Sequence, residues 1–156
     1  KIESNQLEFK PKRGQVDYSN ARWAPVINCV VKYKDKILLV KRSRSLRFYP
    51  GVWNGVGGFL DDQKGLREKI EEELREELGI LPKDIRHVRT GGIFHEDSPK
   101  YKKTWIIHPV LAEVRTNKIK LDWEAEDYRW VSVVEAKKLP VVPSFKTVLK
   151  KLEKFL

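Results

Sequence analysis

Apolar residues gather in short runs along the chain, and most of these runs are typical of β-strands. In chain order they cover residues 25–33, 37–41, 52–60, 85–94, 103–114 and 127–131. The first two runs flank the turn Lys34-Asp35-Lys36, which predicts a hairpin. The run at 52–60 is interrupted by glycines, so we expect only short strand pieces there.

Three other segments repeat apolar residues at helical spacing. The first has a stripe made of Leu66, Ile70, Leu74 and Leu78. This stripe predicts a helix over residues 65–78, and Gly79 suits the left-handed backbone of a C-cap. Shorter helices are predicted over residues 134–139 and 144–155, separated by the prolines at 140 and 143.

The length and composition fit one domain with an N-terminal extension. Residues 1–20 are polar and are predicted to form an arm or a short edge strand, ahead of a single domain at residues 21–156. No apolar run approaches the ~18 residues of a membrane span, so we expect no membrane partner. The single cysteine, Cys29, lies in an apolar run, which predicts a buried thiol and agrees with a reducing cytoplasm. The sequence contains no methionine, so we expect it to be less than the complete translated product.

The formal net charge of +10 indicates a surface that attracts polyanions such as nucleotides and RNA. Basic residues cluster at 10–13, 41–47, 100–103 and 150–154. The cluster at 41–47 lies just before the glycine-rich run, where cations would hold phosphate groups. Lysine-rich surfaces also serve solubility, and we prefer that interpretation for the C-terminal cluster.

Three carboxylates share one face of the predicted helix. Glu73, Glu76 and Glu77 are three and four residues apart, so their side chains project from the same side. Like charges repel on an isolated helix, which favours a hard cation that neutralises them. Oxygen-only ligands point to Mg²⁺ or Mn²⁺. The plainer alternative is a solvated face with ion pairs such as Lys69 with Glu73.

Residues 57–80 resemble the Nudix box, the signature of hydrolases that cleave a nucleoside diphosphate linked to another group. Gly58, Gly79 and the three glutamates fall in register with the family pattern. Two positions depart from it, because Lys64 stands where the family has Glu and Glu72 stands where it has Arg. The resemblance to Nudix (MutT-like) hydrolases implies an α/β (α+β) fold, an α/β/α sandwich with a mixed β-sheet flanked by helices.

The resemblance also implies roles for individual residues. The expected metal ligands are Gly57 through its backbone carbonyl, Glu73, Glu76 and Glu77, with Mg²⁺ or Mn²⁺ as the cofactor. Many family members carry a further acid in the loop before a tryptophan that corresponds to Trp130. Counting back from it reaches Glu124, with Glu126 as the alternative. The general base is then one of Glu73, Glu76 and Glu124.

Substrate-binding residues are expected on the loop before the box. Arg42 and Arg47 are the candidates for holding a diphosphate, and Trp53 is a candidate for stacking on a base, although aromatics at strand positions are usually core residues. Arg42, Arg47 and Gly51 match part of a coenzyme A subclass pattern, but the pattern is incomplete. We therefore expect a nucleotide-derived small-molecule substrate of unspecified identity, with RNA as a further partner and a homodimer left open.

The two departures from the box support two hypotheses. Lys64 and Glu72 reverse both signs of the family pattern, so they could form a charge-swapped pair that holds the loop on the helix. Alternatively, they mark a binding module on the same fold that has lost turnover and holds a nucleotide or RNA. The intact glutamates favour the enzyme, a metal-dependent hydrolase in which water attacks a phosphorus of the diphosphate.

Overall fold

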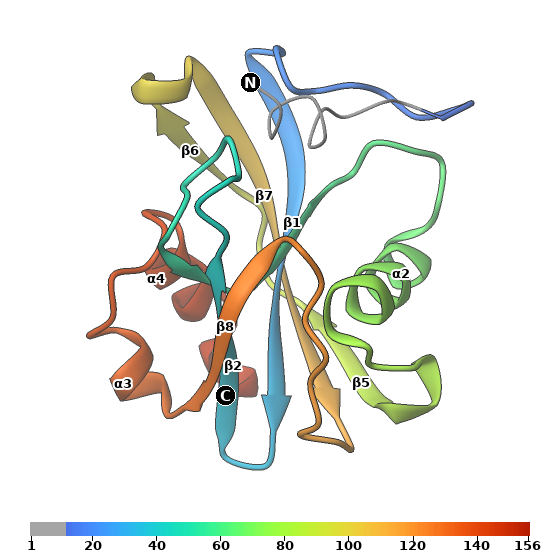
Figure 1. The fold of residues 1–156 in the computed structure, drawn as a ribbon, viewed down its shortest axis with the longest axis vertical. Helices are drawn as coiled ribbons and strands as arrows, with labels where there is room; N and C mark the ends of the chain where they lie inside the picture. The colour runs from blue at the N-terminus through green and yellow to red at the C-terminus, as the bar shows by residue number, and fades with distance from the viewer. Residues whose placement is uncertain (1–11) are drawn as a thin grey trace.

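The computed structural model describes residues 12–156, and a mixed β-sheet with helices on both faces forms its centre (Figure 1). The strands are β1 (Trp23–Tyr33), β2 (Lys36–Arg42), β3 (Trp53–Asn54), β4 (Val56–Phe59), β5 (Ile85–Thr90), β6 (Phe94–Ser98), β7 (Lys103–Val114) and β8 (Ala125–Val131). The α-helices are α2 (Leu66–Leu78), α3 (Val133–Ala136) and α4 (Phe145–Lys151). Short 3₁₀ turns cover Pro82–Asp84, Pro99–Tyr101 and Glu153–Phe155. This arrangement confirms the predicted α/β/α sandwich.

Strand β1 lies at the middle of the sheet. It runs parallel to β7 over ten residue pairs, from Trp23 to Lys32. Its first half pairs antiparallel with β4, and its end pairs antiparallel with β2 across the predicted hairpin. Strand β2 in turn pairs with β3 and β8, and β7 pairs with β5 and β6. A strand covered on both faces needs apolar residues throughout, which explains the nearly continuous apolar run of β1.

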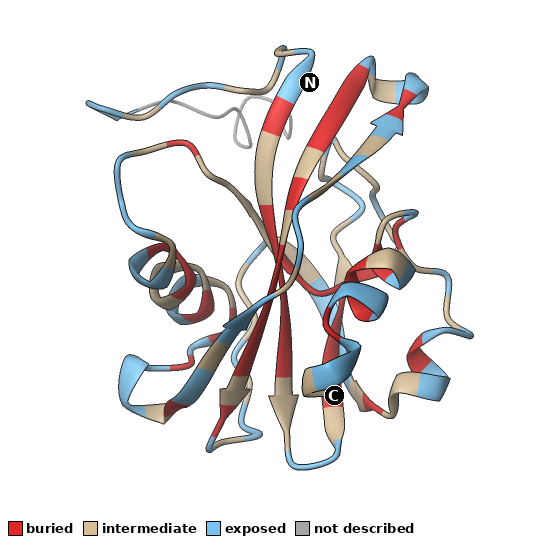
Figure 2. Ribbon diagram, turned by 180° about the vertical axis from the view of Figure 1, so that it is seen from behind, coloured by how far each residue is buried: buried red, intermediate tan, exposed pale blue. Residues whose placement is uncertain are grey.

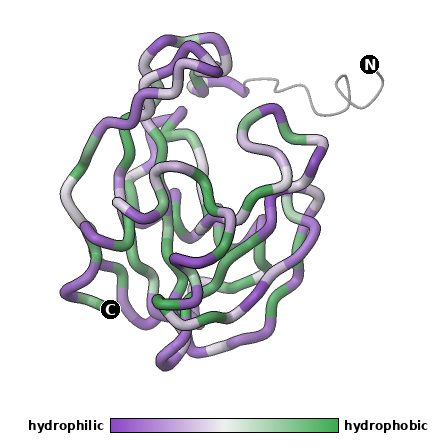
Figure 3. Tube along the Cα trace, turned by 90° about the vertical axis from the view of Figure 1, so that its left-hand side faces the viewer, coloured by the Kyte–Doolittle hydropathy of each residue, from purple (hydrophilic) through white to green (hydrophobic). Residues whose placement is uncertain are grey.

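The two faces of the sheet carry separate hydrophobic cores. One core packs under α3 and α4 and includes Phe145 and Leu149. The other packs under α2 and includes Ile70, Leu74 and Cys29. Figure 2 shows the buried residues along the central strands and the inner sides of the helices, and Figure 3 shows hydrophobic residues following these strands. Cys29 is buried as predicted, and burial raises the pKa of its thiol to about 12.

Helix α2 forms where the apolar stripe and the cap predict it. Ile70, Leu74 and Leu78 are fully buried against the sheet. The helix begins after Gly65 and ends at Gly79, whose φ of 71° is the left-handed conformation that favours glycine. The N–H of Gly79 donates to the carbonyl of Arg75, which closes the last turn.

Three sequence predictions about element boundaries are wrong. Residues 85–94 do not form one strand, because the chain breaks at Gly91 and Gly92 and continues as the separate strand β6. A Cβ at position 91 would lie 2.7 Å from the carbonyl oxygen of Lys151, so the chain passes α4 too closely for other residues. The predicted helices at 134–139 and 144–155 are shorter, since the first ends at Ala136 and the second at Lys151.

The N-terminal extension crosses the loop that leads into α2. Residues 12–22 form turns without a strand, and the rest of the predicted arm, residues 1–11, lies outside the described residues. The N–H of Val16 donates to the carbonyl of Asp61 at 2.6 Å, and Gln15 Nε2 donates to Asp61 Oδ2 at 2.9 Å. Within residues 12–156, no helix has both the length and the apolar character that a bilayer crossing requires.

Candidate functional site

Helix α2 and strand β4 bring the box glutamates against a glycine. Strand β4 pairs with β1 so that Gly57 lies opposite Asn28 and Gly58 opposite Ile27. A Cβ at Gly58 would lie 2.9 Å from both Cδ and Oε1 of Glu73, so only glycine leaves this carboxylate in its place. The i, i+4 spacing then puts Glu77 one helical turn further along the same face.

Glu73 and Glu77 form a partly buried pair of carboxyl groups. Burial raises the pKa of Glu77 well above its usual range, and a hydrogen bond to Glu73 and the charge of Glu124 raise it further. Burial also raises the pKa of Glu73, although the hydrogen bond from Glu77 opposes this. Glu77 Oε2 is buried and has no hydrogen-bond partner.

A third carboxylate, Glu124, reaches the pair from the loop between β7 and β8. Burial raises its pKa to about 7, and the charges of Asp122 and Glu73 contribute. The loop is held in place at both ends of Glu124, because its N–H donates to Asp122 Oδ1 at 2.9 Å and its carbonyl accepts from the N–H of Ser43 at 2.9 Å. Glu124 therefore belongs to the same electrostatic cluster as the box glutamates.

Arg42, at the end of β2, provides positive charge beside this cluster. Burial lowers the pKa of Arg42, and the carboxylates of Glu77 and Glu124 oppose that lowering. Its Nε donates to the carbonyl of Phe48 at 2.9 Å, which fixes the guanidinium at the base of the basic loop. This bond uses only the Nε–H of Arg42. The terminal N–H groups of an arginine can bond a carboxylate or phosphate in pairs.

The donor set fits a hard divalent cation. Among residues 12–156, no three His, Cys, Asp or Glu side chains converge closely enough to form a ready-made metal centre. However, the buried Glu77 Oε2 lacks a partner, and Gly58 leaves space for the carboxylate of Glu73. Carboxylates that are buried together without a cation carry raised pKa values, and Mg²⁺ or Mn²⁺ would supply the missing positive charge. Glu76 is exposed on the same helix at the edge of this cluster.

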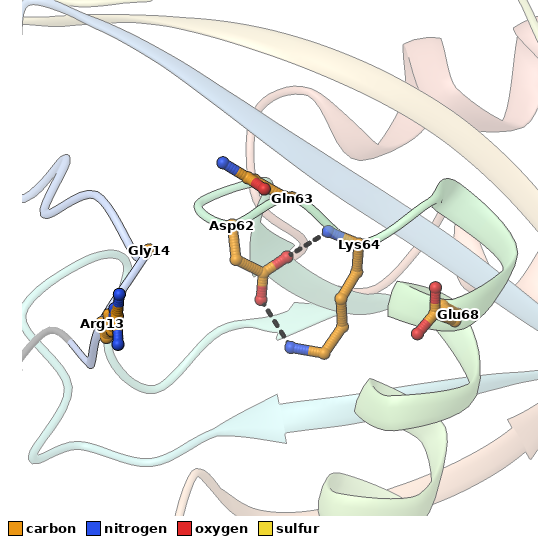
Figure 4. A pocket seen from close by; sticks show the side chains of 6 residues that line it. All are labelled: Arg13, Gly14, Asp62, Gln63, Lys64 and Glu68. Atoms are coloured by element: carbon orange, nitrogen blue, oxygen red, sulfur yellow. Dashed lines mark hydrogen bonds and ion pairs between the residues drawn. The ribbon is translucent and has the colours of Figure 1, made fainter.

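The two departures from the box pattern contact one another. Lys64 Nζ lies 3.2 Å from Glu72 Oε2 and 2.8 Å from Asp62 Oδ2. The hypothesis of a charge-swapped pair between loop and helix is thus confirmed as a contact. Figure 4 shows Lys64 bonding Asp62 through both its N–H and its ammonium group. Hydrogen bonds to Asp62 and Glu72 raise the pKa of Lys64.

A surface hollow of about 350 Å³ lies between this loop and the N-terminal extension (Figure 4). Its lining consists of Arg13, Gly14, Asp62, Gln63, Lys64 and Glu68. None of the clustered glutamates lines the hollow, which is open and carries charges of both signs. It is therefore a neighbour of the carboxylate cluster and not part of it.

Lys69 is the residue of this region that sequence reasoning underestimated. The plainer alternative for the helix treats Lys69 as an ordinary surface partner of Glu73, yet its side chain is only 4% exposed. Its Nζ lies 3.0 Å from Asp61 Oδ1 and 3.9 Å from Glu73 Oε1. Burial disfavours its charged form, but the hydrogen bond and charge of Asp61 outweigh this and raise its pKa. The only signal in the sequence was the i, i+4 spacing to Glu73, which does not predict burial.

Several predicted substrate residues lie apart from the cluster. Arg47 is exposed, with its guanidinium over the ring of Phe48 at 4.9 Å. Trp53 is only 7% exposed and packs in the core under α4, so its placement gives no support to base stacking. Glu126, the alternative to Glu124, pairs with Lys41 at 3.6 Å instead of entering the cluster.

Known proteins resemble this chain over most of its described length. The model of the NUDIX domain family matches residues 22–152. The Nudix hydrolase YvcI of Bacillus subtilis is 27% identical over 121 residues, which span 76% of this chain and 72% of that protein. The NAD-capped RNA hydrolase NudC of Photobacterium profundum is 27% identical over 138 residues, which span 86% of this chain but only 47% of that protein.

Solved structures share the fold at low sequence identity. The NUDIX domain of Shewanella oneidensis NrtR, solved with ADP ribose, has a TM-score of 0.70 and 16% identity, covering 97% of this chain and 96% of that one. The MutT protein of Methanosarcina mazei has a TM-score of 0.67 and 22% identity, covering 85% of this chain and 94% of that one. At this level of identity the likeness extends to the fold alone.

Proposed function

Since this chain belongs to the NUDIX domain family, we propose that it is a metal-dependent hydrolase of a nucleoside diphosphate linked to another group. The observation that carries the proposal is the partly buried carboxylate cluster of Glu73, Glu77 and Glu124, in which the buried Glu77 Oε2 lacks a partner. Such a cluster is unfavourable by itself, which supports a function that requires it.

The residues that would hold Mg²⁺ or Mn²⁺ are Glu73, Glu76 and Glu77, together with the carbonyl of Gly57. Bound there, the cation would neutralise phosphate charge and lower the pKa of a water molecule. The low exposure of Glu73 and Glu77 supports this assignment, because buried oxygen ligands bind a hard cation with less competition from solvent. Glu76 is exposed and would complete the set from the solvent side.

In the reaction, the oxygen of water attacks a phosphorus of the diphosphate and the bond from that phosphorus to the bridging oxygen breaks. A carboxylate accepts the proton of the water, and the products are a nucleoside monophosphate and a phosphorylated remainder. Glu124 is the favoured general base, because it comes from a separate loop and lies half-buried within the electrostatic reach of Glu73. Glu73 and Glu76 are the alternatives.

Arg42 is the favoured phosphate-binding residue of the two predicted arginines. Its guanidinium lies near Glu77 and Glu124, whereas that of Arg47 is exposed over Phe48. An arginine beside the attacked phosphorus would donate to its non-bridging oxygens and stabilise the charge that develops on them. The hydrogen bond from Arg42 Nε to the carbonyl of Phe48 would keep the guanidinium group in one orientation.

The names of relatives support one substrate class for the proposal. The NudC proteins are named as NAD-capped RNA hydrolases, and the Shewanella domain was solved with ADP ribose. Both names concern an adenosine diphosphate linked to a further group. We therefore place NAD, ADP-ribose and NAD-capped RNA first among candidate substrates. The chain spans under half of the NudC relative, so that protein's RNA activity is a proposal for this chain.

The alternative is a binding module without turnover. Its main support was the reversed charges at Lys64 and Glu72, but these residues contact one another at 3.2 Å, so the reversal does not leave an unpaired charge. The formal net charge of +10 fits nucleotide or RNA binding under either function.

Product release from a substrate panel tests the proposal. The panel contains nucleoside triphosphates, ADP-ribose, NAD, dinucleoside polyphosphates, coenzyme A and NAD-capped RNA, each with Mg²⁺, with Mn²⁺ or with a chelator. We expect one class to be hydrolysed with either cation and not with the chelator. Binding without turnover across the whole panel would contradict the hydrolase and support the binding module.

A further inference from the structure

Four carboxylates surround the ammonium group of Lys69. Its Nζ lies 3.0 Å from Asp61 Oδ1, 3.2 Å from Asp62 Oδ2, 3.3 Å from Glu72 Oε1 and 3.9 Å from Glu73 Oε1. Two of these groups belong to the loop before α2, and two belong to the helix itself. The ammonium therefore connects the loop to the helix at the point where Glu73 enters the carboxylate cluster.

This arrangement differs from the exposed ion pairs elsewhere on the helix. The Arg67–Glu71 pair has side chains that are 52% and 29% exposed, whereas Lys69 is 4% exposed and Asp61 is 7% exposed. Exposed pairs contribute little and rearrange easily. A buried lysine is retained only where its charge is compensated, so its position is fixed by its partners.

The same network reaches the N-terminal extension through Asp61. Asp61 Oδ1 accepts from Lys69, and Asp61 Oδ2 accepts from Gln15 Nε2 at 2.9 Å. The carbonyl of Asp61 accepts from the N–H of Val16. Lys69 is thus the buried centre of a set of contacts that joins the extension, the loop and α2.

Glu73 is confined from two further sides. Gly58 lies against its carboxylate, with no space for a Cβ, and Glu77 shares a hydrogen bond with it. Lys69 is the positive group among these neighbours. Removal of its charge would leave Asp61 and Glu73 without their cation, while Asp62 and Glu72 would keep only Lys64, and like charges at these distances repel.

We propose that Lys69 is a positioning residue, which fixes the carboxylate of Glu73 relative to residues 59–64, the end of β4 and the loop after it. The expected effect on turnover rests on the proposed hydrolase function, because it requires that the position of Glu73 matters for catalysis. Lys69 is not expected to touch substrate, so it acts through Glu73 and the loop. Lys69, one helical turn before Glu73, thereby holds the loop and the helix together from a buried position.

The test compares Lys69→Met with Lys69→Arg and with Glu72→Arg placed in the Lys69→Met background. Methionine keeps the apolar length without the charge, arginine keeps the charge, and the double variant returns a cation to the neighbouring position. Arg67→Met is the matched control, because it removes a cation from an exposed pair on the same helix. For each protein, kcat and KM are measured on the panel substrate that the wild type hydrolyses. Backbone hydrogen exchange is measured without metal.

We expect Lys69→Met to lower kcat by about 10- to 100-fold with KM changed by less than about threefold. Hydrogen exchange should accelerate in residues 59–64 while β1 and β7 keep their protection. Lys69→Arg and the double variant should each recover part of the loss, and Arg67→Met should resemble the wild type. If Lys69→Met does not fold, Asp61→Asn weakens the same contact and should show the same local exchange.

Two results would overturn the proposal. One is a Lys69→Met protein with wild-type kcat and wild-type exchange in residues 59–64. The other is a loss that Lys69→Arg does not relieve at all, together with faster exchange across the entire sheet, which indicates general destabilisation. A wild-type protein without turnover on any substrate would contradict the hydrolase function instead, and the exchange measurement would still decide the role of Lys69.

Discussion

Gly58 shows how a single residue sets the geometry of the carboxylate cluster. A Cβ at this position would lie 2.9 Å from the Oε1 of Glu73, closer than real Cβ atoms approach a heavy atom. The group in the way is the end of a flexible side chain, so the fold can adapt while Glu73 moves. Gly58 is therefore required for the position of the carboxylate more than for stability.

Gly58→Ala is expected to lower kcat by about tenfold or more, because it displaces Glu73, while the free energy of unfolding changes by about 1 kcal/mol or less. Gly65→Ala is the matched control, since a Cβ there meets nothing within 4 Å. Steady-state kinetics and chemical denaturation of both variants check this. Equal kcat for the two variants would refute the role assigned to Gly58.

Residue identity predicted chemistry better than it predicted placement. The acidic face at Glu73 and Glu77 and the burial of Cys29 followed from spacing and from apolar neighbours. The burial of Lys69 did not follow, because local sequence does not show that Asp61 folds back over the helix. For Trp53, an aromatic side chain is compatible both with stacking on a base and with core packing. Only the tertiary structure shows that the residue is buried in the core.

At the scale of elements, helix α2 was predictable because several local signals agree. The apolar stripe, the glycine after it and Pro82 all define the same boundaries. The prediction did not separate strands β5 and β6, although Gly91 and Gly92 lie between them and a glycine pair is typical of a turn. What divides them is the close approach of Gly91 to the carbonyl of Lys151, a contact between distant segments.

The Lys64–Glu72 contact predicts coupled effects of charge reversal. Lys64→Glu and Glu72→Arg should each lower the unfolding midpoint, because each places like charges together. The double variant should lose less than the sum of the two single losses, since the contact re-forms with opposite polarity. Additive losses in thermal unfolding would show that the contact contributes no coupling. Kinetics on the same proteins would show whether the loop–helix connection also supports turnover.

At the scale of the whole molecule, the candidate site combines segments that are far apart in sequence. Helix α2 contributes Glu73 and Glu77, the loop before β8 contributes Glu124, and the end of β2 contributes Arg42. The hydrogen bond from Ser43 to the carbonyl of Glu124 brings the last two segments together. Sequence spacing predicted the first pair, and the resemblance predicted Glu124, but neither could predict that they share one buried environment.

This shared burial predicts how stability depends on pH when no divalent cation is bound. The pKa of Glu124 is raised to about 7 and that of Glu77 is raised as well, so the folded state binds more protons than the unfolded state above the usual glutamate range. The free energy of unfolding should therefore rise as pH falls from about 8 to about 6. Added Mg²⁺ should reduce this rise, because it favours the charged carboxylates.

Chemical denaturation with a chelator at these two pH values measures the effect. Glu124→Gln is the reference, because glutamine cannot take up the proton, and the wild type should gain more stability on acidification than this variant. Wild type and Glu124→Gln with the same pH dependence would exclude a raised pKa at Glu124.

The most direct test of the account is the effect of Glu77→Gln on turnover of whichever panel substrate the wild type hydrolyses. The change keeps the shape of the side chain and removes its charge, so kcat should fall by about a hundredfold or more, with weaker Mn²⁺ binding and an intact fold. Glu71→Gln, on the exposed side of the same helix, should keep kcat within about twofold. A Glu77→Gln protein that turns over and binds Mn²⁺ like the wild type would contradict the central claim that the buried glutamate cluster is the metal-dependent catalytic site.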